Sequence, residues 1–213
     1  MTDRFVPAET DLLVLVDIQR DFCPGGALAV PDGDAVVPVA NRLARRFAHV
    51  ILTQDWHAPG HRSFASAHPG RAPFETVEMP YGPQVLWPDH CVQGTAGAEF
   101  HPGLDVPMAQ AVIRKGFRPE IDSYSAFFEN DRRTPTGLAG QLRERGVRRC
   151  VFAGLALDFC VACSAEDAVR CGFEALVVED GCRAIDTGGS LAAARARLAA
   201  AGVRLIRSDG IGG

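Results

Sequence analysis

Polar side chains stand directly after several short apolar runs of this sequence. Asp17 follows the first run, Asp55 and His57 follow the second, Lys115 follows the third, and Cys160 lies shortly after the fourth. Ligand sites of open parallel sheets lie beyond the carboxyl ends of the strands. If the runs are parallel strands, these five side chains belong to one site.

Cys160 is the candidate nucleophile of this site. Its predicted place is the start of a helix, where unpaired backbone amides and the positive end of the helix dipole favour a thiolate. Asp17 can take the thiol proton and return it to a leaving group, while Lys115 stabilises the sulfur anion. The backbone amides of Ala156 and Cys160 are the candidate oxyanion hole. The alternative is a small buried side chain without chemistry, as many free cysteines are.

Lys115 is the single lysine among the 22 lysine and arginine side chains. A lysine ammonium is compact and changes its pKa readily on burial, whereas a guanidinium does not. A composition bias that favours arginine could leave one lysine by chance. Its place after a strand indicates instead that the site needs an ammonium group.

Asp55 and His57 are two residues apart, and His90 follows in the segment Trp-Pro-Asp-His-Cys. Two imidazoles and one carboxylate with open positions suit a first-row divalent metal. We therefore expect one divalent ion (zinc, iron or manganese) held by Asp55, His57 and His90, with His61 as an additional candidate ligand. An Asp-x-His pair alone is a weak signal, so a structural role for these side chains is the alternative.

Two further features bear on the ligand. Cys160 and Cys163 have the spacing of a redox dithiol, but a zinc site would need a second pair at matching spacing, which the sequence lacks. Aromatic side chains that can sandwich a flat ring, or simply pack in the core, are Phe22, Trp87, Tyr124 and Phe159.

Short apolar runs alternate with helical stretches along the chain. The predicted strands are residues 12–16, 50–53, 111–113, 150–152, 175–178 and 203–206. The predicted helices are residues 34–48, 136–145, 160–171 and 188–201, several of them ended by a glycine. Apolar runs of this length are typical of strands buried on both faces. The alternation predicts an α/β fold in which helices cover both faces of a parallel sheet.

The stretch from about residue 54 to 110 interrupts this alternation. Neither a helical nor a strand period persists in it, and it contains five of the six histidines. Long irregular connections in compact domains are usually functional. Because no repeat or linker divides the chain, we expect one domain, 1–213, with a loop-rich insert at about 54–110 that binds metal and substrate.

Composition and charge exclude several classes of partner. With 22 basic and 26 acidic residues the net charge is −4, so the chain lacks the cationic field that nucleic acid or an anionic membrane requires. No apolar run approaches the roughly 20 residues of a membrane helix, and the N-terminus lacks signal-peptide features. Seven cysteines, an odd number, indicate reduced thiols. We expect a cytoplasmic protein that binds a small molecule.

Taken together, several segments resemble the nicotinamidase (pyrazinamidase) branch of the isochorismatase-like cysteine hydrolases. The segments are 15–28, 53–57, 87–92, 115–116, 122–127, 154–156 and 160–161, in the order of that family. The resemblance implies a three-layer α/β/α fold with a doubly wound, mainly parallel sheet. It also implies a catalytic Asp17, Lys115 and Cys160, and a cis peptide before Ala156.

The resemblance further implies that Asp55, His57 and His90 bind the metal, and that Phe22, Trp87 and Tyr124 line a ring pocket. The implied reaction is metal-dependent hydrolysis of nicotinamide to nicotinate and ammonia through a cysteine thioester, with pyrazinamide as a second substrate. Leu157 and Phe159 stand where the family more often has threonine and a polar ring, which leaves the substrate preference open.

Three rival interpretations remain at this point. One is an amidase of the same fold that acts on another small carboxamide or ureido substrate. Another is a non-haem iron oxygenase that uses Asp55, His57 and His90 as its facial triad. The third is a catalytically silent binding or redox module built on Cys160 and Cys163. The metal's identity and the oligomeric state, including whether the chain forms a homo-oligomer, are not readable from the sequence.

Overall fold

A six-stranded parallel sheet forms the centre of the molecule in the computed structural model, which describes residues 4–212. Its strands, in spatial order, are β5 (Ala111–Lys115), β2 (His49–Asp55), β1 (Asp11–Val16), β6 (Arg149–Leu155), β7 (Glu174–Arg183) and β8 (Arg204–Ile206). Every pairing within this sheet is parallel. The chain first builds outward from β1 through β2 to β5, and then on the other side from β6 to β8. This order makes the sheet doubly wound.

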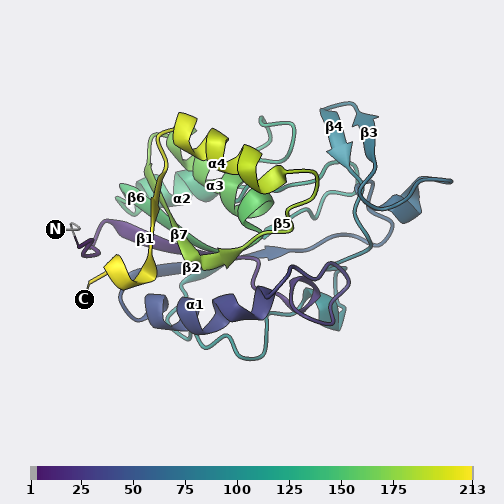
Figure 1. Cartoon of the computed structure of the whole chain (residues 1–213). Coiled ribbons are helices and arrows are strands. Elements are labelled where there is room, and N and C mark those ends of the chain that lie inside the picture. Colours follow the sequence, from purple (N-terminus) through teal and green to yellow (C-terminus); the bar gives the residue numbers. More distant parts are fainter. Residues whose placement is uncertain (1–3, 213) are drawn as a thin grey trace.

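Helices cover both faces of the sheet (Figure 1). Helix α1 (Val36–Ala44) lies on one face, and α2 (Leu138–Glu144), α3 (Ala162–Arg170) and α4 (Ser190–Ala200) lie on the other. Each face has its own apolar cluster, one containing α1 and the other containing α2, α3 and α4. The predicted three-layer α/β/α fold is confirmed.

Strand β1 shows why the strands read as unbroken apolar runs. All six of its residues are buried. Leu13 and Leu15 pack in the cluster on the α1 face, while Leu12 and Val14 pack in the cluster on the opposite face. Because side chains alternate between the two faces of a strand, a sheet covered on both sides needs apolar residues at every position.

The predicted bounds of several elements need correction. Strands β2 and β5 run to Asp55 and Lys115, two residues beyond the predicted ends. The helix expected at 34–48 is a short 3-10 turn followed by α1, which ends at Ala44. The helix expected to begin at Cys160 begins at Ala162, because residues Leu157–Val161 form a π-helical turn.

The stretch 54–110 is not wholly irregular, contrary to expectation. It contains an antiparallel ribbon of β3 (Thr76–Met79) and β4 (Gly82–Val85). Each strand is only four residues long. Polar and apolar residues alternate in β3 but for these four residues only, and β4 contains Pro83 and no alternation. The pattern is therefore too short to predict the ribbon. The ribbon stands away from the main sheet, on the side opposite both termini (Figure 1).

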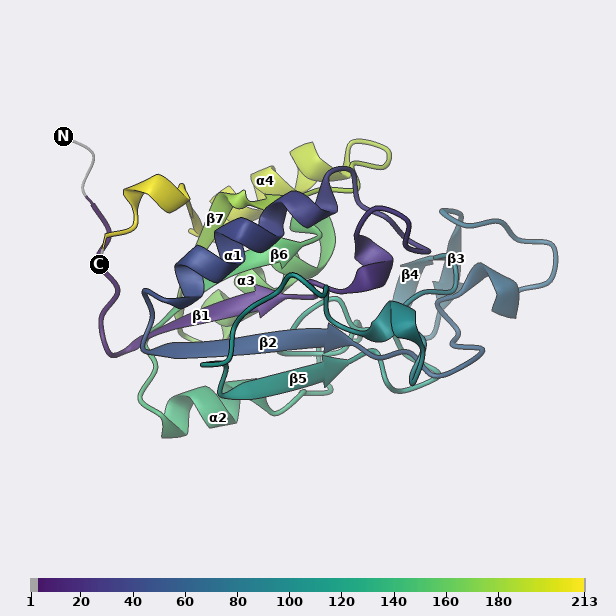
Figure 2. The same ribbon diagram turned by 90° about the horizontal axis from the view of Figure 1, so that it is seen from below.

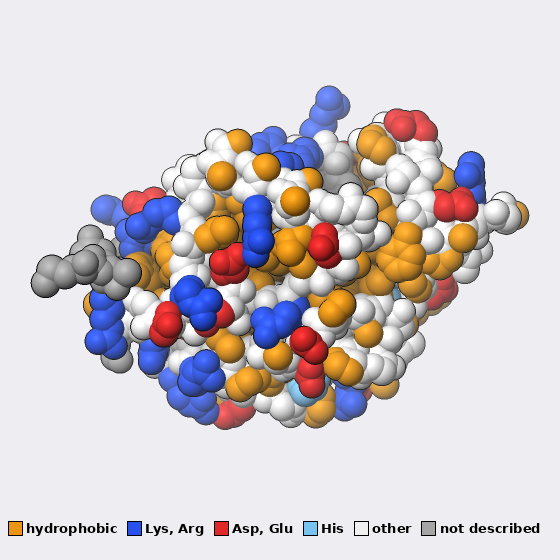
Figure 3. Space-filling model, viewed as in Figure 1, with side chains coloured by type: hydrophobic (Ala, Val, Ile, Leu, Met, Phe, Trp, Pro, Cys, Tyr) orange, Lys and Arg blue, Asp and Glu red, His pale blue; other side chains and the backbone are white. Residues whose placement is uncertain are grey.

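Basic and acidic side chains are interspersed on the face of the molecule seen in Figure 3. Ion pairs of the protein include Arg149–Glu174 and Arg195–Glu179. Among the described residues, no helix combines the length and the apolar character needed to cross a membrane.

Candidate active site

The carboxyl ends of four adjacent strands bring the predicted site residues together. Asp17 follows β1, Asp55 and Lys115 are the last residues of β2 and β5, and Cys160 lies five residues after β6. Asp55 and Lys115 are direct partners in the register of β2 and β5. The arrowheads of β1, β2 and β5 all point toward the side that carries the β3–β4 ribbon (Figure 2). Parallel pairing thus gathers residues that are more than 140 positions apart in the sequence.

Lys115 is the centre of a fully buried polar group. Its Nζ lies 2.8 Å from Asp17 Oδ2 and 3.4 Å from Cys160 Sγ, and it also contacts Asp55 Oδ1. Burial by itself lowers the pKa of this ammonium, but the two carboxylates outweigh that effect and raise the pKa well above its ordinary value. Lys115 is therefore a fixed positive charge beside the thiol.

Both oxygens of Asp17 are engaged within the site. Thr53 Oγ1 donates to Asp17 Oδ1 at 2.6 Å and accepts from the Asp17 amide at 3.1 Å. Oδ2 forms the ion pair with Lys115 Nζ at 2.8 Å. Burial raises the pKa of Asp17, and Lys115 opposes this shift without cancelling it. A carboxylate with a raised pKa is a stronger base, so Asp17 is suited to accept a proton.

The Cys160 thiol faces two carboxylates as well as Lys115. Oxygens of Asp17 and Asp55 and the sulfur of Cys160 all lie within 4.8 Å of one another. Burial raises the pKa of this thiol well above its ordinary value, Lys115 opposes the shift, and the two carboxylates add to it. The expected position at a helix start is corrected, since α3 begins only at Ala162 and Cys160 lies in the π-helical turn before it. The peptide between Leu155 and Ala156 is cis, as the resemblance implied.

Asp55, His57 and His90 form a buried group whose ligand atoms lie within 4.8 Å of one another. His90 Nδ1 contacts the Pro88 carbonyl oxygen at 2.8 Å, which leaves Nε2 facing Asp55 Oδ2 at 3.5 Å. His57 Nε2 contacts Asp122 Oδ1 at 3.0 Å, and His57 Nδ1 is buried without a hydrogen-bond partner among residues 4–212.

This donor set fits a divalent cation. A buried imidazole nitrogen without a partner is costly unless a ligand uses its lone pair. Two nitrogens and one carboxylate oxygen suit a first-row metal. Burial raises the pKa of Asp55, but Lys115 and His57 outweigh it and lower the pKa, so the carboxylate is ionised and able to bind a cation.

His61 lies next to His57, with ring centroids 4.6 Å apart, but it is placed differently from the other three candidates. Its Nδ1 contacts Ser63 Oγ at 2.8 Å and its Nε2 contacts the Arg118 carbonyl oxygen at 2.7 Å. Both ring nitrogens are therefore already engaged within the protein. His61 groups with His57 and Asp122 rather than with Asp55 and His90.

One cavity contains both the thiol and the candidate metal group. Its aromatic walls include the three predicted residues Phe22, Trp87 and Tyr124 together with Phe159. Phe159 presents its edge to Trp87, with centroids 4.9 Å apart and the rings 87° from parallel. Leu28 and Ile185 complete the apolar lining. The cavity thus offers aromatic and aliphatic walls to a ring, together with the thiol and the candidate metal ligands.

Several side chains that support the site were not predicted. Gln19 donates to the Asp55 carbonyl oxygen and accepts from the Asp55 amide, both at 2.8 Å, which fixes the end of β2. Gly116 has a positive φ of 67°, and a Cβ there would lie 2.7 Å from His57 Nε2. Thr53 is buried at the end of an apolar run. A hydroxyl group at such a position could have identified Thr53 as a site residue from the sequence. Gln19 and Asp122 had no comparable signal.

The fold and the site define a three-layer α/β/α protein with a buried aspartate, lysine and cysteine beside a candidate metal group. The isochorismatase domain model matches residues 11–210, and the chain belongs to this family.

Relatives of known activity resemble the chain over nearly its whole length. A nicotinamidase from Acinetobacter baylyi is 52% identical over 208 residues, which cover 98% of this chain and 97% of that protein. The structure of an Acinetobacter baumannii nicotinamidase/pyrazinamidase has a TM-score of 0.94 at 54% identity, and covers 95% of this chain and 98% of the other.

Two similar structures contain a ligand or a metal. The Pnc1 protein from L. infantum, solved in complex with nicotinate, has a TM-score of 0.84 at 40% identity over 96% of each chain. A pyrazinamidase from Pyrococcus horikoshii, solved in complex with zinc, has a TM-score of 0.76 at 34% identity, and covers 93% of this chain and 99% of the other.

Proposed function

We propose that this protein is a nicotinamidase that hydrolyses nicotinamide to nicotinate and ammonia and also accepts pyrazinamide. The observation that carries the proposal is the shared cavity, in which the Cys160 thiol and the Asp55–His57–His90 group meet between aromatic walls. A carboxamide carbon can then lie at the sulfur while the ring nitrogen faces the metal group. The similarity to nicotinamidases over nearly the full chain supports this assignment.

In the first half of the proposed reaction, Asp17 takes the proton of the Cys160 thiol and the sulfur attacks the carboxamide carbon. Asp17 has the raised pKa that this step needs, and one of its oxygens lies within 4.8 Å of the sulfur. Lys115, 3.4 Å from the sulfur, stabilises the anion as it forms. The amides of Ala156 and Cys160 are the proposed oxyanion hole. The carbon–nitrogen bond then breaks, and Asp17 passes its proton to the departing ammonia.

The second half of the reaction hydrolyses the thioester that links the acyl group to Cys160. Asp17, again a carboxylate, takes a proton from water, and the resulting hydroxide attacks the thioester carbon. The carbon–sulfur bond breaks, nicotinate leaves, and the proton returns to the sulfur. Over both halves one amide and one water become one acid and one ammonia, so the residues end as they began.

Asp55, His57 and His90 are the residues that would hold the metal. When bound, a divalent cation supplies a Lewis-acid contact for the pyridine nitrogen, which orients the ring. The zinc in the Pyrococcus pyrazinamidase supports a metal of this type, while its identity here stays a prediction. The cytoplasmic location also stays a prediction.

The test is ammonia release from nicotinamide and from benzamide by metal-reconstituted protein, with intact-mass measurement of any Cys160 adduct. Benzamide is the matched control because its ring lacks the nitrogen. We expect ammonia from nicotinamide and hardly any from benzamide. Equal release from both would remove the role of the ring nitrogen and favour an amidase of broader specificity. No ammonia from intact, metal-loaded protein would overturn the proposal.

A further inference from the structure

Gln84 connects the candidate metal group to the wall of the ring pocket. It lies on β4 and is 1% exposed, although the ribbon around it is largely exposed or half-buried. Its Nε2 lies 3.0 Å from Asp122 Oδ2 and 3.0 Å from the Tyr124 hydroxyl oxygen. A third acceptor, the Val85 carbonyl oxygen, is 2.8 Å away and shares the two amide hydrogens. One side chain of the ribbon therefore contacts two residues with different roles in the site.

The first arm of this connection leads through Asp122 to His57. Asp122 Oδ1 lies 3.0 Å from His57 Nε2 and accepts from the Ser123 amide at 2.8 Å, while Oδ2 accepts from Gln84. A carboxylate at Nε2 fixes the proton on that nitrogen and turns the Nδ1 lone pair toward the candidate metal position. Asp122 can keep this geometry only if rotation of its carboxylate is restrained. Gln84 supplies that restraint by donating to Oδ2, the oxygen that does not contact His57.

The second arm leads through Tyr124 to Trp87. The Tyr124 hydroxyl oxygen accepts from Gln84 and from Trp87 Nε1, each at 3.0 Å. Tyr124 and Trp87 are both walls of the cavity that contains Cys160, and their rings meet edge to face with centroids 6.2 Å apart. The angle of both rings is therefore set by a hydrogen bond that starts on Gln84.

The orientation of the Gln84 amide is determined by donors on its other side. Oε1 accepts from Asn130 Nδ2 at 3.0 Å and from the Tyr81 hydroxyl at 3.2 Å. With two donors facing the oxygen, the nitrogen must face Asp122 and Tyr124.

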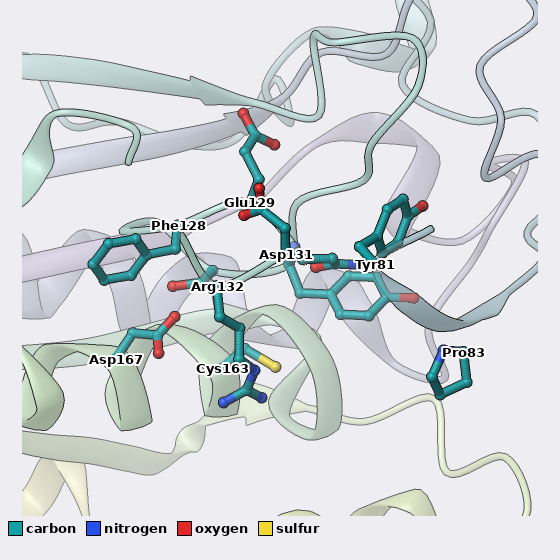
Figure 4. A pocket seen from close by; sticks show the side chains of 11 residues that line it. Tyr81, Pro83, Phe128, Glu129, Asp131, Arg132, Cys163 and Asp167 are labelled. Carbon is teal, nitrogen blue, oxygen red and sulfur yellow. Dashed lines mark hydrogen bonds between the residues drawn. The ribbon is translucent and has the colours of Figure 1, made fainter. Parts of the chain in front are cut away.

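Tyr124 also borders a second cavity. This cavity has a volume of about 340 Å³, and Tyr81 and Pro83 of the ribbon region lie in its wall (Figure 4). Tyr124 lines both this cavity and the cavity with Cys160. Its ring packs edge to face against Trp87 and Phe159, with centroids 6.2 and 5.6 Å apart. The hydrogen bonds to its hydroxyl group act together with this packing to set its position.

We propose that Gln84 is a positioning residue that couples the orientation of His57, through Asp122, to the orientation of Tyr124 and Trp87. Through this coupling the β3–β4 ribbon sets both the affinity for the metal and the fit of the aromatic ring. The part that concerns ring binding rests on the proposed function. The part that concerns metal affinity rests only on the contacts of described residues.

The test compares Gln84→Met, which keeps the length of the side chain but removes the amide, with the control Tyr81→Phe. The control removes one bond to the outer oxygen of Gln84 and leaves the Asn130 donor in place. The readouts are Zn²⁺ affinity by chelator competition, Trp87 fluorescence against a Trp87→Phe reference, and kcat and KM for nicotinamide. We expect Gln84→Met to weaken Zn²⁺ binding about 10–100-fold, to shift the fluorescence, and to raise KM more than it lowers kcat. Tyr81→Phe should change each quantity less than about twofold.

A second pair of variants tests the coupling and guards against misfolding. Gln84→Asn keeps the amide but shortens the side chain, so it cannot reach both acceptors. Asp122→Asn removes the carboxylate that contacts both His57 and Gln84, so it should weaken Zn²⁺ binding, and combining it with Gln84→Met should weaken binding less than the two changes multiplied. Wild-type Zn²⁺ affinity in a folded Gln84→Met or Gln84→Asn protein would overturn the proposal. If the Gln84 variants alter Zn²⁺ affinity and fluorescence but the wild-type protein releases no ammonia from nicotinamide, the proposed function is overturned instead.

Discussion

The ammonium of Lys115 lies 3.4 Å from the sulfur of Cys160, with both side chains buried. A positive charge this close favours the anionic form of the sulfur, yet the net effect of the site is to raise the pKa of the thiol. Burial of the sulfur outweighs the effect of Lys115, and the carboxylates of Asp17 and Asp55 add to the rise. The site thus places beside the thiol both a base that can remove its proton and a cation that can stabilise the resulting anion.

Replacement of the nucleophile should separate chemistry from binding. Cys160→Ala is expected to lower ammonia release from nicotinamide by at least about 1000-fold while nicotinate binding, measured by calorimetry, persists. The matched control is Cys163→Ala, one helical turn away, whose thiol lines the second cavity. That variant should keep its activity. An active Cys160→Ala protein would refute the covalent mechanism, and loss of activity only in Cys163→Ala would favour the redox interpretation.

Removal of the lysine should destabilise the protein as well as inactivate it. Lys115→Met leaves two buried carboxylates without their counter-ion, a change that costs about 3–5 kcal/mol in comparable buried pairs. Urea unfolding followed by circular dichroism measures this loss. Arg195→Met breaks a surface pair with Glu179 and should cost less than about 1 kcal/mol. Equal stability of the two variants would show that Lys115 does not neutralise the carboxylates.

Loss of a proposed metal ligand should be visible in metal content. His57→Ala and His90→Ala are expected to bind less than about a tenth of the metal bound by the wild type and to raise the apparent KM for nicotinamide. Elemental analysis after dialysis against Zn²⁺ provides the measurement. His68→Ala serves as the control, because His68 lies outside every candidate group. Unchanged metal content in the His57 and His90 variants would refute these assignments.

His61→Ala decides the remaining candidate. Because both ring nitrogens of His61 are engaged by Ser63 and Arg118, we expect this variant to keep its metal. Metal loss equal to that of His90→Ala would show that His61 is a ligand after all.

Glu129 should make stability depend on pH. Burial raises the pKa of this carboxyl from its ordinary 4.5 to about 7, and Arg118 opposes the shift. Between these pH values the folded state binds more protons than the unfolded state, so the Glu129 contribution falls as pH rises. Glu129→Gln should therefore gain stability relative to wild type from pH 5 to 7 and show no further change above about pH 8. Urea unfolding at each pH, with exposed Glu120→Gln as control, measures the difference. A constant difference across this range would contradict the raised pKa.

Asp158 should anchor one edge of the ring pocket. Its carboxylate accepts from the amides of Ile185 and Asp186 at 3.1 and 2.8 Å and from the Ser190 hydroxyl. Asp158→Ala leaves these donors unpaired and should lower the free energy of unfolding by about 2–4 kcal/mol. Because Ile185 lines the cavity, KM should rise as well. Asp209→Ala, an exposed control, should change neither quantity. Unchanged KM together with reduced stability would restrict Asp158 to a structural role.

Much of the architecture was predictable because its causes are local. Strands covered on both faces are mostly apolar along their length, and the six apolar runs therefore predicted the six strands of the sheet. Polar residues that follow four of these runs predicted the site, since parallel strands bring their carboxyl ends to one edge. Asp17, Asp55, Lys115 and Cys160 were found in this way.

The remaining features depend on contacts between segments that no local pattern links. Gln84 meets Asp122 across 38 positions and Tyr124 across 40, and its own strand has no apolar period. The engagement of both His61 nitrogens and the raised pKa of Cys160 likewise follow from neighbours that only folding supplies. The sequence by itself determined which chemical groups the protein carries and the sheet edge at which they meet. Tertiary structure decided which of their atoms are free to react, because burial and hydrogen bonding act through space and not along the chain.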